Sequence, residues 1–314
     1  MSGGAVVVQD MGGTDIVTTD NQPLRVLRAK DSFRFPGGKR IGIVFNIAYE
    51  AWSPGKAPPI GPMGNVLQPG FFDTNAHSWA SYGAVRGIQR LLRIAEKNRI
   101  RTSVMTSGVL AEKFPASVRA IHEAGHEIVA HSYGMDVIPV YLDEAAELAN
   151  LRRNTALIEK AAGVRPIGWI SPRGTGSLAT PRLLAAEGYQ WHGDCNDDDL
   201  PAIWEFAGAG GAPQRIVGIP LTMDVNDLPH SIRYGNGPEQ FVATFKATLD
   251  GARAADEAPF MLDVTAHTHT YGRPAGAWAW DACIRSAKAA GDVWIGTRAE
   301  ICALALGDAG EVFG

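Results

Sequence analysis

The clearest structural signal in the chain is the stretch Phe260-Met261-Leu262-Asp263-Val264-Thr265-Ala266-His267-Thr268-His269-Thr270-Tyr271-Gly272-Arg273-Pro274. It begins with an apolar run of strand length and ends with a histidine pair and a Gly-Arg-Pro turn. The run predicts a buried strand, and α/β enzymes place catalytic side chains at the C-terminal ends of such strands. His267 is therefore the first catalytic candidate.

The second histidine of the pair, His269, first suggests a metal site. In a continuous strand, two residues two positions apart point to the same face. The turn at Gly272-Arg273-Pro274 follows so closely, however, that we expect the strand to end before His269. Only His267 is then placed at the strand end.

Outward from this stretch, apolar runs alternate with segments of helical periodicity. The predicted strands are 41–48, 102–106, 127–130, 167–170, 215–219, 260–266 and 293–296. The predicted helices are 84–95, 109–124, 143–162, 238–253, 276–290 and 297–306. Strands separated by helices predict a parallel α/β fold, and the lack of a GxGxxG fingerprint favours a (β/α) barrel over a dinucleotide-binding sheet.

Three segments interrupt the alternation. Residues 1–38 lack periodicity, and we interpret them as an N-terminal arm that wraps the domain or reaches a neighbouring subunit; residues 39–314 form the single barrel domain. Residues 53–70 are rich in proline and glycine and predict a long loop. Residues 194–212 join an acidic cluster to a Gly-Ala stretch and predict a second long insertion.

Composition excludes several classes of function. The chain has 314 residues, of which 46% are hydrophobic, and its net charge is -4. It contains no long basic run, so nucleic acid and anionic membranes are not expected partners. The N-terminus has no signal-peptide pattern, and we expect a cytoplasmic protein. The cysteines Cys195, Cys283 and Cys302 are far apart, which fits reduced thiols.

Polar residues directly follow the predicted strands. In a parallel sheet, the C-terminal ends of the strands lie at the same edge, so these side chains should lie close together. They are Glu50 after the first strand, His131 after the third, Arg173 after the fourth, Asp194 with the run 197–199 after the fifth, and His267. Each residue alone is weak support for a site. Their convergence is the argument.

Read together, these motifs resemble the polysaccharide deacetylase family over residues 41 to about 305, and within it the branch of allantoinases and cyclic-imide hydrolases. The matching segments are Tyr49-Glu50, Gly125-His126-Glu127-Ile128-Val129-Ala130-His131-Ser132, Arg173, Asp194-Cys195-Asn196-Asp197-Asp198-Asp199-Leu200-Pro201, Ile219-Pro220-Leu221-Thr222-Met223-Asp224-Val225-Asn226-Asp227 and 267–274. The resemblance implies a distorted barrel of about seven parallel strands, a small-molecule substrate and a homo-oligomer.

The metal site of the deacetylases is altered in this sequence. The family pattern has two adjacent aspartates after the first strand, one a base and one a metal ligand, and a His-Ser/Thr motif with a second histidine. Here Glu50 takes the position of the base, Ala51 follows it, and Met135 replaces the second histidine. A catalytic zinc needs three protein ligands, so we predict a metal-independent enzyme. A rearranged site that includes Asp136, or one built from His269 and the aspartates, remains the alternative.

The resemblance implies roles for individual residues in amide hydrolysis. Glu50 is the general base or orients the water, His267 is the general acid or base, and His131 polarises the carbonyl. Arg173 pairs with Asp194 or holds a substrate carbonyl or carboxylate. The residues assigned to substrate binding are Arg173, Asp194, Asp198, Trp79, Trp204 and Arg273, the last of which also shapes the turn after His267.

The predicted function is hydrolysis of a carbon–nitrogen bond, other than a peptide bond, in a small cyclic amide, imide or ureide. One alternative is a metal-dependent deacetylase of amino sugars. Another is a barrel that binds a ligand or a partner without catalysis.

Overall fold

The computed structural model describes residues 21–61, 64–208, 212–256, 259–307 and 312–314, and the backbone of two short strands, β1 (Val7–Gln9) and β2 (Asp15–Val17). β1 and β2 pair antiparallel. The rest of residues 1–20 of the predicted arm, and residues 62–63 and 209–211 of the two predicted loops, lie outside the described residues.

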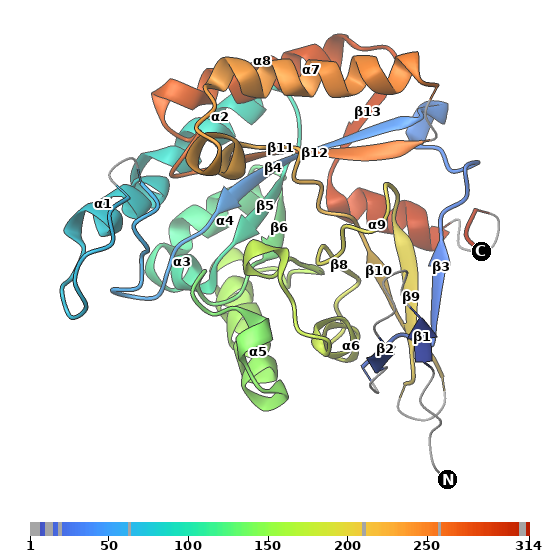
Figure 1. Ribbon diagram of the computed structural model, residues 1–314, viewed down its shortest axis with the longest axis horizontal. Coiled ribbons are helices and arrows are strands. Elements are labelled where there is room, and N and C mark those ends of the chain that lie inside the picture. Colours follow the sequence, from blue (N-terminus) through green and yellow to red (C-terminus); the bar gives the residue numbers. More distant parts are fainter. Residues whose placement is uncertain are drawn as a thin grey trace.

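One mostly parallel sheet forms the centre of the molecule (Figure 1). In spatial order, its parallel strands are β11 (Val225–Asn226), β12 (Phe260–His267), β4 (Ile41–Tyr49), β5 (Ser103–Thr106), β6 (Glu127–Ala130), β7 (Gly168–Trp169), β8 (Trp191–His192) and β10 (Gln214–Gly218). A further strand, β13 (Val293–Gly296), pairs parallel with β4. The predicted α/β architecture is therefore confirmed.

All seven predicted strands are present, and the two that the prediction lacks on the parallel path, β8 and β11, have only two residues each. Within the described ranges, the path of paired strands continues from β10 to two antiparallel strands and does not return to β11. The barrel is thus distorted and open on one side, since a regular barrel closes its hydrogen-bonded ring.

Helices cover the outside of the sheet (Figure 1). They are α1 (Thr74–Tyr82), α2 (Ile88–Asn98), α3 (Gly108–Lys113), α4 (Pro115–Glu123), α5 (Glu144–Ala162), α6 (Thr180–Ala186), α7 (Pro238–Ala254), α8 (Pro274–Ala289) and α9 (Arg298–Gly307). The short helices are η1 (Pro36–Gly38), η2 (Gly83–Gly87), η3 (Pro139–Tyr141), η4 (Pro172–Gly174) and η5 (Leu228–Arg233). None of the helices in the described ranges combines the length and apolar character needed to cross a bilayer.

Two helices illustrate what sequence patterns do and do not settle. The prediction of one helix over 109–124 is wrong, because the chain forms α3 and α4 with a break at Phe114. Pro115 is the first residue of α4, where its missing N–H costs nothing. By contrast, α5 matches the predicted helix 143–162 to within one residue: Asp143 is its N-cap and accepts a hydrogen bond from the Ala146 N–H, and Gly163 ends the helix at φ 78°.

The second predicted insertion, residues 194–212, contains a strand and is not entirely a loop. β9 (Ala202–Phe206) pairs antiparallel with β10 on one side and with β3 (Arg25–Arg28) on the other. Ile203 and Phe206 on β9 are buried. The strand forms because two neighbours satisfy its backbone and its apolar side chains enter the core.

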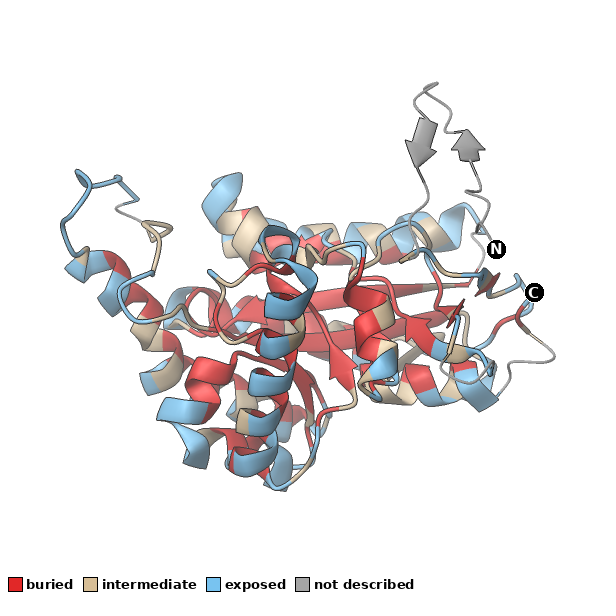
Figure 2. Ribbon diagram, turned by 90° about the horizontal axis from the view of Figure 1, so that it is seen from below, coloured by how far each residue is buried: buried red, intermediate tan, exposed pale blue. Residues whose placement is uncertain are grey.

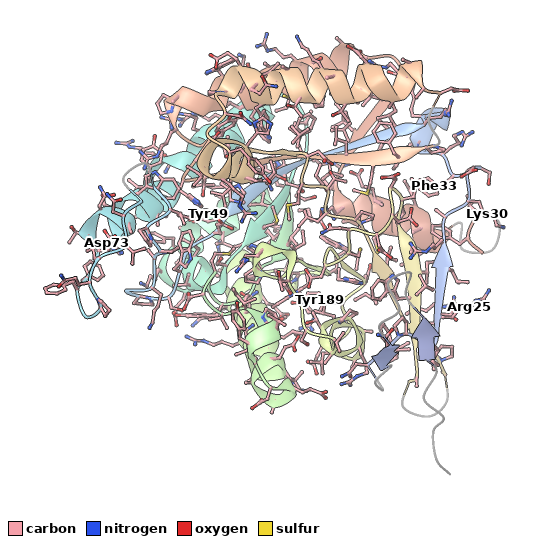
Figure 3. The ribbon with its side chains drawn as sticks, in the orientation of Figure 1. Arg25, Lys30, Phe33, Tyr49, Asp73 and Tyr189 are labelled. Atoms are coloured by element: carbon pink, nitrogen blue, oxygen red, sulfur yellow. The ribbon has the colours of Figure 1, made fainter. Side chains whose placement is uncertain are left out.

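The described part of the arm adds to the same sheet. Figure 3 shows Arg25 on the edge strand β3, and Lys30 and Phe33 on the chain that follows it. Phe33 and Phe35 are fully buried, and Phe35 stacks on Trp294 with ring centroids 5.5 Å apart. Residues 25–35 therefore wrap the domain.

Side-chain alternation along β4 separates two layers of core. On the outer face, Ile43, Phe45 and Ile47 pack with residues of α2. On the inner face of the curved sheet, Val44 and Ala48 pack with other residues, among them Met105 and Ile170. Figure 2 shows the strands of the central sheet largely in the colour of buried residues. Because a strand alternates with period two, the residue after Ala48 on the inner face is Glu50.

β12 alternates in the same way. Its outer face carries Leu262, Val264 and Ala266, which pack toward the helices, and its inner face carries Met261. His267 shares the odd register of Met261, so the strand delivers it to the inner face. Its register partner on β4 is Ala48, which places the ends of β4 and β12 side by side.

Candidate functional site

A cavity of about 800 Å³ opens at the C-terminal ends of the strands. Four residues predicted from the sequence line it: Glu50, His131, Arg173 and His267. The other lining residues are Ala48, Ile60, Met105, Met135, Ile170, Gly174, Thr175, Leu221, Met223, Asp224, Asn226, Leu228, Pro229, His230, Ile232, Arg233, Tyr234 and Asn236. The lining mixes apolar side chains with polar and charged ones, and polar groups that converge in a cavity of this size are typical of a small-molecule site.

Glu50 is the centre of the polar cluster. Its carboxylate is buried, and three imidazole Nε2 atoms surround it: His131 at 3.5 Å, His267 at 3.6 Å and His269 at 3.7 Å. Burial alone raises a carboxyl pKa, but the positive charge of His267 outweighs it and lowers the pKa of Glu50 to about 2. Glu50 is therefore a carboxylate at neutral pH.

His267 forms a dyad with Asp227. Its Nδ1 lies 2.6 Å from Asp227 Oδ1, and the other Asp227 oxygen accepts hydrogen bonds from the backbone N–H groups of His267 and Tyr271. Burial lowers the pKa of a histidine, but the carboxylates of Glu50 and Asp227 outweigh it and raise the pKa of His267 to about 9. His267 is therefore an imidazolium at neutral pH, with Nε2–H directed to the Glu50 side of the cavity.

The register of the sheet brings Asp227 to this position. Asp227 follows β11 directly, and the β11 residue before it, Asn226, is paired with Thr265 on β12. In the sequence, Asp227 is only the last residue of the motif 219–227, and no role is predicted for it. No local pattern could reveal its role, because its partner His267 lies 40 residues further along the chain.

His131 is held by the neighbouring strand. Its Nδ1 lies 2.6 Å from the carbonyl oxygen of Ile170. A carbonyl only accepts, so Nδ1 carries a proton, and in the neutral ring Nε2 is an acceptor. His131 polarises a carbonyl only when it is doubly protonated, which changes the role expected from the sequence.

His269 enters the site although it lies beyond the strand. β12 ends at His267, as expected, and a turn brings His269 back against Glu50. Trp79 packs against its ring with centroids 4.6 Å apart. Burial lowers the pKa of His269 to about 3, so the ring is neutral, and neither ring nitrogen has a hydrogen-bond partner among the described residues.

Arg173 reaches the cavity from a strained turn. Its backbone is left-handed, with φ 64° and ψ 12°, a conformation rare for residues other than glycine. Ser171, just before the turn, donates its N–H to Oδ1 of the half-buried Asp194 at 2.7 Å. Asp194 thus anchors the Arg173 turn from behind, and no direct ion pair joins Arg173 to Asp194 in the described structure.

Four other predicted substrate-binding residues are not among the described residues that line the cavity. Asp198 pairs with Arg28 of the arm at 2.6 Å. The Trp204 ring packs on His192 at 4.7 Å. Arg273 donates to the backbone oxygen of His269 and so shapes the turn after His267, and the Trp79 ring contacts His269.

The deacetylase metal triad does not fit the residues present. Ala51 offers no ligand atom, and Met135, which lines the cavity, offers a soft thioether that hard cations disfavour. Oδ1 of Asp136, the substitute at the longer spacing, accepts the Ser53 N–H at 2.7 Å. In the part of the chain that the structure describes, no three His, Cys, Asp or Glu side chains are grouped so that they could hold a metal ion.

Comparisons with known proteins relate the chain to deacetylases and to an allantoinase. Residues 72–192 match the polysaccharide deacetylase family. The chain is 28% identical to the PuuE allantoinase of known structure, with a TM-score of 0.76, over 88% of this chain and 93% of that one. A structure from Pseudomonas aeruginosa PAO1 named as a probable polysaccharide deacetylase gives 28% identity and a TM-score of 0.75, over 88% and 94% of the two chains. A peptidoglycan deacetylase of Helicobacter pylori is 24% identical over 174 residues, which is 49% of this chain and 59% of that protein.

Proposed function

We propose that this chain, which carries a polysaccharide deacetylase domain, is a metal-independent hydrolase of carbon–nitrogen bonds in small cyclic amides, imides or ureides. The observation that carries the proposal is the pairing of an ionised Glu50 with a protonated His267 at one end of the cavity. Such a pair supplies a base and an acid of opposite protonation state, which amide hydrolysis requires.

In the proposed reaction, Glu50 removes a proton from water while the water oxygen bonds to the substrate carbonyl carbon. His131 Nε2 accepts the second hydrogen of that water and orients it. His267 then donates its Nε2 proton to the ring nitrogen as the carbon–nitrogen bond breaks. Glu50 is left protonated and His267 neutral, and proton transfer over the 3.6 Å between them restores the resting state.

Asp227 supports the acid step. Its carboxylate fixes the orientation of the imidazole through Nδ1 and stabilises the imidazolium before the proton leaves. Arg173 binds a carbonyl or carboxylate of the substrate, as its place in the cavity lining suggests.

Two observations favour a cyclic substrate over an acetylated sugar. The loss of the metal triad at Ala51 and Met135 removes the Lewis acid of the deacetylase reaction. Among the similar structures of known name is an allantoinase, whose name refers to a cyclic ureide. A deacetylase of amino sugars is the second candidate, because the family match and the Helicobacter pylori relative point to that chemistry.

Activity on a small panel separates these candidates. The purified protein is assayed on succinimide, glutarimide, hydantoin, allantoin and N-acetylglucosamine oligomers, with and without EDTA, and its metal content is measured. We expect turnover of at least one ring compound that EDTA does not change. Stoichiometric metal together with EDTA-sensitive release of acetate contradicts the proposal, and the lack of any turnover favours a barrel that only binds.

A further inference from the structure

The cavity is larger than the ring that the proposed reaction needs. Volumes of about 300 to 1,000 Å³ hold drug-sized ligands, and this cavity measures about 800 Å³. A five-membered imide or hydantoin leaves most of that space unfilled. The substrate therefore has room for a side chain on the ring.

The walls indicate the chemistry of that side chain. Beyond Glu50 and the histidines, aliphatic residues such as Met105, Ile170 and Leu221 line one part of the cavity, and polar residues such as Asn226 and Asn236 line another. Two arginines, Arg173 and Arg233, also line the cavity, and both are exposed. Aliphatic wall residues together with guanidinium groups fit an alkyl chain that ends in an anion.

The two arginines come from separate elements. Arg173 lies in η4 after β7, and Arg233 ends η5 after β11. Among the described residues, neither guanidinium has an ion pair or a side-chain hydrogen bond. Both are therefore available to an anionic ligand.

The backbone at Arg173 supports a functional role. A left-handed conformation at a residue with a Cβ costs about 1 kcal/mol or more and persists where the surrounding structure enforces it. Here the Asp194 carboxylate holds the Ser171 N–H that precedes the turn. The strained backbone conformation thus occurs at the residue whose guanidinium group lines the cavity.

Charge is also distributed unequally. The whole chain carries a net charge of -4. The cavity lining, however, has three cationic side chains, Arg173, Arg233 and the protonated His267, against two anionic ones, Glu50 and Asp224. Glu50 and Asp227 offset the charge of His267, so the two arginines and Asp224 are the other charged side chains in the described lining, and the arginines attract an anionic ligand.

We infer that the substrate is a cyclic amide or ureide whose side chain ends in a carboxylate, and that Arg173 and Arg233 bind this carboxylate. The inference rests on the proposed function, because it names the substrate class of the same site. It goes further because it distinguishes ring substrates with an anionic side chain from those with a neutral one.

Three hydantoins with side chains of equal length at carbon 5 test the inference: hydantoin-5-propionic acid, its primary amide and hydantoin-5-propylamine. We expect kcat/KM for the acid to exceed that for the amide by about tenfold or more, since one charge-assisted contact has this effect. The amine should be the poorest substrate. Equal turnover of acid and amide overturns the inference and leaves the proposed function intact, whereas no turnover of any ring overturns both.

Variants assign the preference to the two arginines. Arg173→Gln and Arg233→Gln should each reduce the acid-to-amide ratio of kcat/KM several-fold, and Arg233→Glu should raise the amine relative to the acid. Arg119→Gln, on the exposed face of α4, is the matched control and should leave the ratio unchanged. An unchanged ratio in all three cavity variants contradicts the inference even where the wild type prefers the acid.

Discussion

Nε2 of His267 lies 3.6 Å from Oε1 of Glu50, and the two groups hold opposite charges while both are buried. Each stabilises the charged form of the other against burial, which alone favours neutral forms. The pair is therefore a single acid–base unit, and the protonation state of one residue depends on the other.

Removal of the base should abolish most of the activity. We expect Glu50→Gln to lower kcat by about 10²- to 10⁴-fold on the best ring substrate, because the amide keeps the shape but cannot accept the water proton. The measurement is steady-state kinetics with a urea midpoint to verify folding. Glu112→Gln, at an exposed residue that hydrogen-bonds Tyr133, serves as the control and should keep wild-type kcat. A Glu50→Gln enzyme within tenfold of wild type would remove Glu50 from the mechanism.

The pH profile should report the same pair. Activity requires ionised Glu50 and protonated His267, so kcat/KM should stay high through neutral pH and fall as the pH rises through about 9. Asp227→Asn removes one carboxylate that raises the pKa of His267, so the alkaline limb should move to lower pH and the maximum rate should fall.

A matched substitution separates this effect from a general loss of charge. Asp250→Asn alters an exposed carboxylate on α7 that pairs with Arg253, and it should leave the alkaline limb in place. If Asp227→Asn has the same alkaline limb as the wild type, the dyad does not set the protonation of His267.

Much of the fold was predictable from periodicity. β4 and β12 are long and buried, so their apolar runs are unambiguous in the sequence. β8 and β11 have two residues each, and only their neighbours in the sheet define them. β9 was missed because Pro201 precedes it and a Gly-Ala stretch follows it, so the turn signals outweighed five strand residues.

The site was predictable where it follows strand ends and not where it depends on pairing across the sheet. Glu50, His131 and His267 lie directly at strand ends and line one cavity, as the parallel arrangement predicts, while their catalytic roles remain predictions. Asp227 and His269 act through contacts that only the folded chain creates. The family resemblance, by contrast, was evident from motifs and is confirmed by the match over residues 72–192.

The buried ion pair below the cavity should be essential for stability. Arg298 contacts both carboxylate oxygens of Asp263, at 2.7 and 2.6 Å, and donates to the backbone oxygens of Ile219 and Pro220. Arg298→Met should lower the free energy of unfolding by about 3 to 5 kcal/mol, because it leaves the Asp263 charge buried without its partner. Urea denaturation measures the change.

Two further variants test this account of the ion pair. Arg285→Met removes an exposed arginine that pairs with the partly buried Asp281 and should cost about 1 kcal/mol or less. The double variant Asp263→Leu/Arg298→Met should be less destabilised than the sum of its single variants, because no unpaired charge remains. Strict additivity would argue against a direct interaction between Asp263 and Arg298 as the source of the stability.

The ionisation of Asp194 should lower the free energy of unfolding as the pH rises, which is the opposite of the effect of a salt-bridged aspartate. Burial raises its pKa from 3.8 to about 6, so between these values the folded protein binds more protons at this site than the unfolded chain does. Its contribution to stability therefore falls as the pH rises from about 4 to about 6. Asp194→Asn cannot ionise, so the free energy of unfolding of the variant minus that of the wild type should increase by about 2 to 3 kcal/mol across this window. Urea denaturation of both proteins at pH 4 and pH 7 measures the difference, in which other titrating groups cancel. A difference that stays constant with pH would mean that the carboxyl group of Asp194 is not desolvated behind the Arg173 turn.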